Sequence, residues 1–333
     1  MLDIIIPAYN CKNTLPRALA SILANTNSEK CIVTIVDDCS TENLEPIVND
    51  FKKYLKIQYI KLDKNLRWPG LVRQVGIDKT TSPYIMFLDA DDIFAPEAID
   101  KAYSTIINTD NDVIIGAFAQ QLENNEMIPM DTDKTTWVHG NIYKRQFLID
   151  NEIYFFKGYN EDGAFNTQCY LLSDKVGAIS NCLYYWLWND SSITRKKDGE
   201  FSTILLEQFI TTLIPAYENI LNKTKNLNKV LQNMGTHFAF CFKMMNECMN
   251  ENKQKEIELG EKAIEKFSKK FIQSLSLEQQ YHFKKGFKEG IKNYLTGEKI
   301  SLNIQDFLNQ YNTHIVFTLE DLLQEDENES NSN

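Results

Sequence analysis

The chain has 333 residues, of which 43% are hydrophobic and 24% charged. This composition is typical of a soluble globular protein with one large domain or a core domain and an extension. The net charge of −11 disfavours binding to a nucleic-acid backbone. No run approaches the ~18 apolar residues of a membrane span. The seven cysteines, without a Cys-x-x-Cys pair, predict reduced thiols in a cytoplasmic protein rather than disulfides or a zinc site.

Short apolar runs alternate with amphipathic stretches over roughly the first 115 residues. This alternation predicts an α/β fold whose mostly parallel sheet is flanked by helices on both faces. Strands are expected at 4–6, 32–36, 57–62 and 84–88, with another beginning at 112–116. Helices are expected at 14–23, 47–55 and 71–77, and a fourth opens at Pro96.

The pattern changes twice further along the chain. Residues 117–200 are less regular and rich in aromatic side chains, most of which we expect to lie in a core. Helical periodicities then run through 203–221, 227–250, 254–272 and 277–295. They predict a separate all-α domain over residues 201–324, followed by a disordered acidic tail at 325–333.

The apolar run Ile85–Leu88 ends in the carboxylates of Asp89, Asp91 and Asp92. In extended backbone Asp89 and Asp91 would project to the same side. Two like charges beside a hydrophobic core are costly unless something positive neutralises them. A hard divalent cation bound by carboxylate oxygens would do so.

Two earlier strands also end in residues suited to a ligand. Pro7, Tyr9 and Asn10 follow the first strand, and Asp38 and Ser40 follow the second. Because ligands bind at the carboxyl ends of parallel strands, these residues predict a pocket that stacks a flat ring beside a metal. Taken alone, Asp38 and Ser40 also fit a turn followed by a helix N-cap.

These segments occur in a familiar order. IIIPAYN (4–10), IVDDCST (35–41), VRQVGI (72–77) and FLDADD (87–92) resemble the pattern of glycosyltransferase family 2. NEDGAF (160–165) looks like the Glu-Asp motif of that family, and YYW (184–186) with SIT (192–194) looks like the segment that closes its catalytic domain. The resemblance covers residues 1–200, which we therefore interpret as the catalytic domain.

The resemblance implies a GT-A fold, a UDP-sugar donor, Mn²⁺ or Mg²⁺ as cofactor, and inversion at the anomeric carbon. Asp91, with Asp89, would bind the metal, and Asp162 would be the general base. The implied donor-binding residues are Pro7, Tyr9, Asn10, Asp38, Arg73, Asp89, Ala90 and Asp91. Candidate contacts to the acceptor or the diphosphate are Glu161, Trp186, Asn189 and Arg195.

Within this assignment Pro7 and Tyr9 would flank the uracil, and Asp38 would accept a hydrogen bond from its N3–H. Arg73 would balance negative charge near the diphosphate. Two plainer interpretations remain open: Arg73 as a surface helix arginine, and Asp162 as a helix N-cap with Glu161 in a surface loop.

The chain departs from the family pattern in two places. Trp188-Asn189-Asp190 stands where a histidine often helps to bind metal or diphosphate, so Asn189 or Asp190 is a candidate replacement. Arg67-Trp68-Pro69-Gly70 replaces a small, glycine-rich approach to Arg73, which predicts a bulkier rim of the donor pocket. Lys196 and Lys197 are either a basic loop over the diphosphate or solvated side chains.

The acceptor is left open by the sequence: a glycan, a glycolipid or other lipid-linked saccharide, a teichoic-type polymer, or a protein. Bacterial or phage-related surface-glycan synthesis, at the inner face of the membrane, is the setting implied. Peripheral membrane association and a homo-oligomer through the carboxyl-terminal helices are candidate properties, with no nucleic-acid partner.

Three competing classes of protein share some of these features. A receiver-type signalling domain would carry its acidic pair after the first strand, which here ends in Pro-Ala-Tyr-Asn. A nucleotidyltransferase would carry a glycine-rich, basic phosphate loop at that point. A catalytically silent GT-A-like scaffold or binding subunit would lack the carboxylates at Asp38, Asp89, Asp91 and Asp162.

Overall fold

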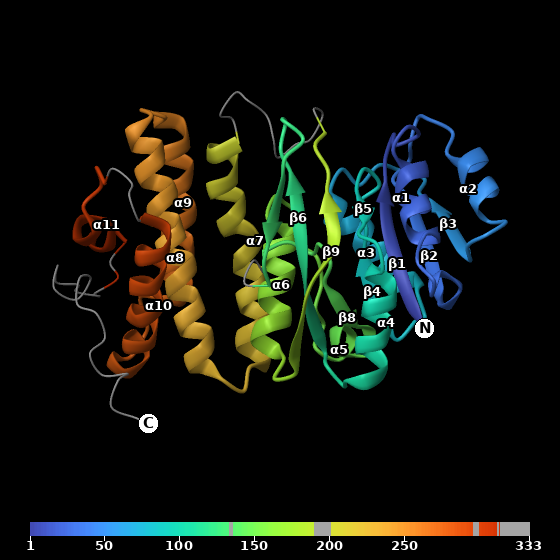
Figure 1. The fold of residues 1–333 in the computed structure, drawn as a ribbon. Helices are drawn as coiled ribbons and strands as arrows, with labels where there is room; N and C mark the ends of the chain where they lie inside the picture. The colour runs from blue at the N-terminus through green and yellow to red at the C-terminus, as the bar shows by residue number, and fades with distance from the viewer. Residues whose placement is uncertain (133–135, 190–200, 296–299, 312, 314–333) are drawn as a thin grey trace. The chain divides into compact units, whose positions relative to one another are not determined.

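A computed structural model describes residues 1–132, 136–189, 201–295, 300–311 and 313. The chain divides into two compact units, Met1–Arg195 and Lys196–Asn333. Figure 1 shows the strands gathered in the first unit and long helices in the second. Each unit is described by itself.

The first unit is built on one nine-stranded sheet. Its first four strands are parallel, in the order β3-β2-β1-β4: β1 (Leu2–Ala8), β2 (Cys31–Asp37), β3 (Ile57–Lys61) and β4 (Tyr84–Phe87). The sheet continues through β8 (Ile142–Lys144), β6 (Val113–Gln121), β9 (Val176–Trp186) and β5 (Ile93–Phe94), and β7 (Met127–Met130) pairs with β6. The predicted parallel strands are confirmed, but β8 runs antiparallel to both β4 and β6, so the sheet is mixed beyond β4.

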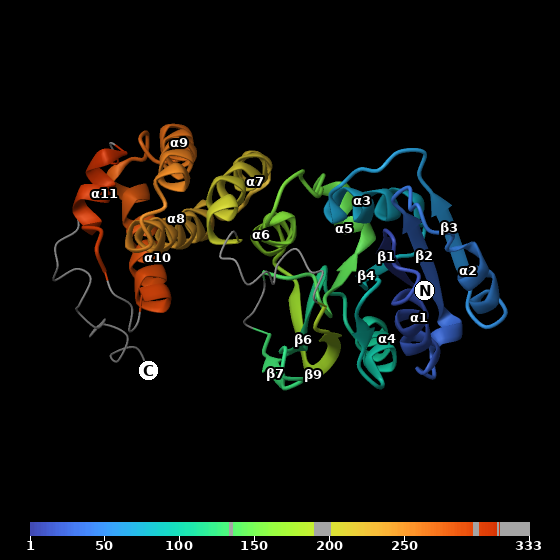
Figure 2. The same cartoon turned by 90° about the horizontal axis from the view of Figure 1, so that it is seen from above.

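Helices cover both faces of this sheet (Figure 2). On one face lie α1 (Leu15–Leu23), α2 (Glu45–Phe51) and α4 (Ala98–Asn108), and on the other lie α3 (Pro69–Lys79), α5 (Arg145–Asp150) and α6 (Glu161–Leu172). A short 3₁₀ helix, η1 (Ser28–Lys30), precedes β2. Because side chains alternate along a strand, Ile4 and Ile6 pack in one core and Ile5 packs in the other. The central strands are therefore apolar throughout, as the sequence shows.

The carboxyl ends of β1, β2 and β4 meet at one edge of the sheet, where Asp38 N donates to Ala8 O at 2.8 Å. Ile85–Leu88 are all buried, as predicted. The expectation that Asp89 and Asp91 lie in extended backbone is wrong, because β4 ends at Phe87. A turn follows, in which Asp92 N donates to Asp89 O at 3.0 Å. This turn directs the acidic side chains to different partners.

The second unit consists of α7 (Phe201–Lys223), α8 (Leu227–Asn250), α9 (Gln254–Phe271), α10 (Leu277–Leu295) and α11 (Ile304–Gln310). Helices α8 and α10 approach closely at Gly286, where a Cβ would collide with the backbone carbonyl of Gln232. Across the described helices, none has both the length and the apolar character that crossing a membrane requires. The four long helices that the sequence predicts are present as α7 to α10. Their function stays a prediction.

Candidate active site

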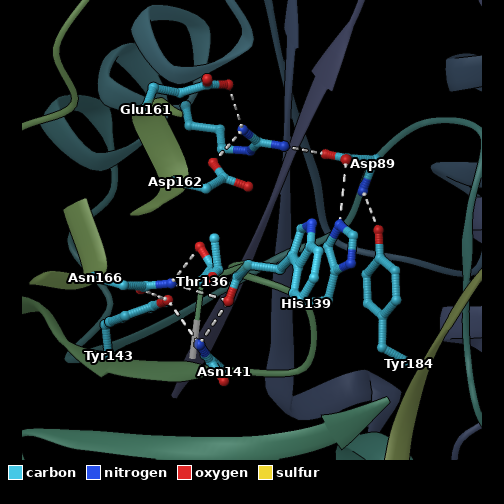
Figure 3. A network of polar contacts seen from close by, with 11 residues as sticks. Asp89, Thr136, His139, Asn141, Tyr143, Glu161, Asp162, Asn166 and Tyr184 are labelled. Atoms are coloured by element: carbon cyan, nitrogen blue, oxygen red, sulfur yellow. Dashed lines mark hydrogen bonds and ion pairs between the residues drawn. The ribbon is translucent and has the colours of Figure 1, made fainter. Parts of the chain in front are cut away.

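A buried arginine lies at the centre of the candidate site. Arg73, on α3, is 3% exposed, and its guanidinium contacts three carboxylates. Figure 3 labels these carboxylates as Asp89, Glu161 and Asp162. Nη2 lies 2.5 Å from Asp89 Oδ1, and Nη1 lies 3.0 Å from Asp162 Oδ1 and 3.6 Å from Glu161 Oε1. The interpretation of Arg73 as a surface helix arginine is therefore wrong. Arg73 joins the carboxylate of Asp89, just after β4, to Glu161 and Asp162, which lie far along the sequence.

One cation does not compensate three carboxylates equally. Burial raises the pKa of Asp89, but the charges of Arg73 and His139 outweigh burial and hold that pKa well below its ordinary value. For Glu161, burial and the neighbouring Asp162 outweigh Arg73 and raise the pKa to about 8. Burial likewise raises the pKa of Asp162. The site therefore favours an ionised Asp89 and a Glu161 that carries a proton near neutral pH.

Glu161 and Asp162 form the first turn of α6, and both side chains are mostly buried. The N-cap residue is Asn160, in left-handed backbone at φ +63°. The alternative in which Asp162 caps the helix and Glu161 lies in a surface loop is therefore wrong. Helix α3 packs tightly here, because a Cβ on Gly70 would lie 2.5 Å from Glu161 Cγ.

Behind Asp89 lies an aromatic support that sequence reasoning missed. The His139 ring stacks on Tyr184, with centroids 4.5 Å apart and planes 4° apart, and His139 Nε2 lies 3.8 Å from Asp89 Oδ2. The Tyr184 hydroxyl donates to Asp92 Oδ2 at 2.6 Å and accepts from Asp89 N at 3.2 Å. Figure 3 shows His139 and Tyr184 side by side beneath Asp89. A lone histidine without ligand spacing gave no signal of this role.

Two groups of side chains are candidates for binding a metal. Asp89, Asp92 and His139 bring ligand atoms within 4.8 Å of one another. Asp92 and His139 are buried, however, and both Asp92 oxygens already accept hydrogen bonds, from the Tyr184 hydroxyl and from Leu187 N. This group therefore serves the internal structure of the site.

The second group lies at the turn itself. Asp91 is half-buried, and its Oδ2 accepts from Asn189 Nδ2 at 2.8 Å. An amide turned about its last bond would present its oxygen instead of its nitrogen. A carboxylate and an amide oxygen suit a hard divalent cation that also binds phosphate oxygens. The residues present thus fit the metal that the family implies, and Asn189 stays a candidate for the place of the usual histidine.

Asp38 lies at the end of β2 and is 4% exposed. Its carboxylate accepts from Leu66 N at 2.6 Å and from Arg67 N at 3.2 Å, and burial raises its pKa. Ser40 Oγ accepts from Asn10 N at 3.0 Å. The alternative in which these two residues form an N-cap is wrong, because Leu44 is the N-cap of α2. Both instead fix the loops around the predicted uracil site.

The remaining predicted residues lie as follows. Tyr9 is 51% exposed at the end of β1, next to the partly buried Pro7, and Ala90 is buried. Trp186 is half-buried, with its ring 5.2 Å from that of His139. Arg195 lies outside the described residues, as do Asp190, Ser192, Ile193, Thr194, Lys196 and Lys197.

Residues 3–161 match the family model described as "Glycosyl transferase family 2". This stretch of the chain belongs to glycosyltransferase family 2, which confirms the resemblance inferred from the motifs. The chain is 26% identical over 216 residues to TarS, a poly(ribitol-phosphate) β-N-acetylglucosaminyltransferase of Staphylococcus aureus, covering 60% of this chain and 36% of TarS. It is also 26% identical over 219 residues to a poly(ribitol-phosphate) β-glucosyltransferase of Bacillus spizizenii, covering 61% of this chain and 33% of that protein.

The fold is that of a solved relative. The crystal structure of S. aureus TarS 1–349 in complex with UDP matches with a TM-score of 0.60 and 20% sequence identity, over 91% of this chain and 94% of that one. The predicted GT-A fold is confirmed. The chain spans about a third of the length of the two curated relatives.

The raised pKa of Glu161 predicts a pH-dependent stability. With a pKa of about 8 in the folded chain against 4.5 for an ordinary glutamate, the folded state binds the extra proton between these values. Stability therefore falls as the pH rises from 4.5 to 8, by at most about 1.4 kcal/mol per pH unit for this one group. We expect Glu161→Gln to flatten this part of the curve in denaturant titrations. Parallel curves for the variant and the wild type would contradict the assignment.

Proposed function

We propose that the chain is a metal-dependent, inverting glycosyltransferase that moves a sugar from a UDP-sugar to a hydroxyl of a teichoic-type polyol-phosphate polymer. The observation that carries this proposal is the Arg73 network, which joins Asp89 of the donor half to Asp162 of the acceptor half. Among the acceptors that the sequence left open, the polymer is favoured by the activities in the names of both relatives.

The donor would bind along the carboxyl ends of β1 and β2. Tyr9 offers an exposed ring for the uracil, and the Asp38 carboxylate has lone pairs left for the uracil N3–H. The hydrogen bonds from Leu66 N and Arg67 N hold that carboxylate in place before the donor arrives. Asp89, fixed by Arg73, would contact the ribose or the transferred sugar.

Asp91 and Asn189 would hold Mn²⁺ or Mg²⁺. When bound, the cation supplies charge stabilisation to the departing diphosphate without a proton. Arg17, whose guanidinium donates to the Asp91 carbonyl oxygen, fixes the backbone of this turn. Ala90, between the two aspartates, is buried in the hydrophobic core behind this turn.

Asp162 would act as the general base. Transfer passes through an oxocarbenium-like state, and the acceptor hydroxyl needs a carboxylate on the face opposite the diphosphate. Burial raises the pKa of Asp162, which makes it a stronger base than an ordinary aspartate, while Arg73 keeps it oriented. Glu161 beside it would hold a proton and contact the acceptor.

The alternatives are a silent scaffold and a nucleotidyltransferase. Asp162, Asp89 and Arg73 are held in one ionic network, which a purely structural subunit does not need. The turn after β1 contains Asn10 at φ +47° and no glycine-rich phosphate loop. Release of UDP from UDP-sugars in the presence of metal and acceptor is expected of a glycosyltransferase and of neither alternative.

A nucleotide-sugar donor and seven free cysteines favour a cytoplasmic location, where the acceptor chain would be met at the inner face of the membrane. The setting would be bacterial or phage-related surface-polymer synthesis.

Asp91→Asn is expected to weaken Mn²⁺-dependent UDP binding by at least about tenfold, because it removes an anionic ligand. The measurement is thermal stabilisation by UDP with and without Mn²⁺. Asp50→Asn is the matched control, since Asp50 is an exposed helix carboxylate paired with Lys53. Unchanged metal-dependent stabilisation in Asp91→Asn would contradict the assignment of Asp91 as a metal ligand.

Asp162→Asn keeps the size of the side chain but does not accept the proton. We expect transfer to slow by about 10²–10⁴-fold while UDP-sugar affinity stays nearly normal. Steady-state kinetics and calorimetry give the two values, with the exposed Asp78→Asn on α3 as control. Near-wild-type transfer, or an α-linked product from an α-linked UDP-sugar, would contradict the mechanism.

The helical unit is proposed to serve acceptor binding, membrane-surface association or self-association. The predicted stripe on α8 is buried at Val230, Leu231, Met234 and Phe238, so it packs inside the unit, whereas Leu227 is 38% exposed. If self-association is its role, light scattering after size exclusion will give a mass above 38.6 kDa. A monomeric mass at high protein concentration would exclude self-association as the role of this unit.

A further inference from the structure

Positive charge is concentrated in one stretch of this acidic chain. Between positions 262 and 292 there are eight lysines and three acidic residues, whereas the whole chain has a net charge of −11. The stretch covers the second half of α9 and most of α10. Such a local reversal of sign favours an anionic partner at this surface, although the chain as a whole repels anions.

Four of these lysines lie along one side of α9. Positions three or four apart in an α-helix are neighbours on its surface. The four lysines have this spacing, all are exposed, and with Glu265 they line a hollow of about 350 Å³: Lys262, Lys266, Lys269 and Lys270. Lys269 pairs with Glu265, and Lys270 pairs with a glutamate of α7. Lys262 and Lys266 have no ion pair with any residue that the structure describes, so their charges are available to a ligand.

Two large apolar side chains are exposed at the start of α10. Leu277 is 86% exposed, the highest value for a large hydrophobic residue in the described part of the chain, and Tyr281 is 65% exposed. Their spacing of four positions places both on one side of the helix, and the exposed Lys285 continues that side. The other side of α10 is buried at Phe283 and Phe287. Transfer of Leu277 and Tyr281 into an apolar layer would therefore stabilise a bound state without disturbing the core.

The turn between the two helices brings the lysines and the apolar side chains together. Helix α9 ends at Phe271 and α10 begins at Leu277. A hydrogen bond from Leu275 N to Ile272 O, at 3.1 Å, closes the turn between them. The end of α9, with Lys270, is therefore a neighbour of the exposed start of α10.

We propose that the end of α9 and the start of α10 form a docking surface for a membrane that contains anionic lipids. The lysines bind headgroup phosphates, and Leu277 and Tyr281 enter the layer between headgroups and acyl chains. A phosphate polymer in solution would need the lysines alone, so the exposed apolar pair favours a lipid surface. The inference rests on the roles proposed for the helical unit, among which it selects membrane-surface association, and it does not depend on the transfer reaction.

The test is flotation of the whole chain with two kinds of vesicle, pure phosphatidylcholine and phosphatidylcholine with about one third phosphatidylglycerol. We expect binding to the anionic vesicles only, and we expect added salt to weaken it. Lys262→Gln combined with Lys266→Gln should lower binding by about fivefold for each lysine. Leu277→Ser should lower it by about tenfold, because the apolar contact with the bilayer is lost.

Two control variants change the same kinds of residue elsewhere. Lys52→Gln combined with Lys53→Gln removes two exposed lysines at the end of α2, and Ile107→Ser replaces a side chain of α4 that is 63% exposed. Both should leave vesicle binding unchanged. All of these side chains are exposed, so the Tm of each variant should equal that of the wild type.

Three results would overturn the docking surface. The first is equal binding to both kinds of vesicle, or to neither, by the wild type. The second is vesicle binding that Leu277→Ser leaves unchanged. The third is calorimetric binding of a soluble ribitol-phosphate oligomer that the two lysine substitutions abolish while vesicle binding persists, which assigns the lysines to a polymer. Flotation needs neither donor nor acceptor, so each of these results leaves the transfer reaction standing.

Discussion

The buried charge of Arg73 is the constraint on which the site depends. A guanidinium that is 3% exposed is stable only with carboxylates around it, and Asp89, Glu161 and Asp162 supply them from the end of β4 and the start of α6. Three acids around one base leave an excess of negative charge, which burial turns into raised pKa values at Glu161 and Asp162. The same excess of negative charge lies beside the turn where a diphosphate and its cation are proposed to bind, so the electrostatics of the site and its proposed chemistry have one origin.

The contacts behind Asp89 fix the conformation of the turn that follows β4. The His139 and Tyr184 rings stack, the Tyr184 hydroxyl bridges Asp89 N and Asp92 Oδ2, and Leu187 N closes the other side of Asp92. The three acidic residues of this segment, Asp89, Asp91 and Asp92, thus have different partners. Asp89 is fixed by Arg73, Asp92 is used inside the structure, and Asp91 is left with Asn189 at the turn. These different partners distinguish the three aspartates of FLDADD, which their spacing in the sequence did not.

The sequence predicted the parallel strands and the long helices, because apolar runs and helical periodicity are local signals. It also predicted that the strand ends carry the site, since topology brings those ends together. It did not predict the antiparallel insertion of β8, because Ile142–Lys144 is too short to carry a pattern. His139 was missed for a related reason: its contacts with Asp89 and Tyr184 come from segments 50 and 45 residues away (139 − 89; 184 − 139). The extended geometry assumed for Asp89 and Asp91 was wrong because the strand ends one residue earlier than its apolar run.

The contact between Gly70 and Glu161 has a consequence for how such a scaffold diverges. Any larger residue at position 70 would force α3 and α6 apart, and with them the arginine and the candidate base. These two helix starts are therefore fixed relative to each other, and sequence change is tolerated more readily in the loops that precede them. Arg67, Trp68 and Tyr159 lie in those loops. Residues of those loops can thus differ while the reacting groups keep their spacing.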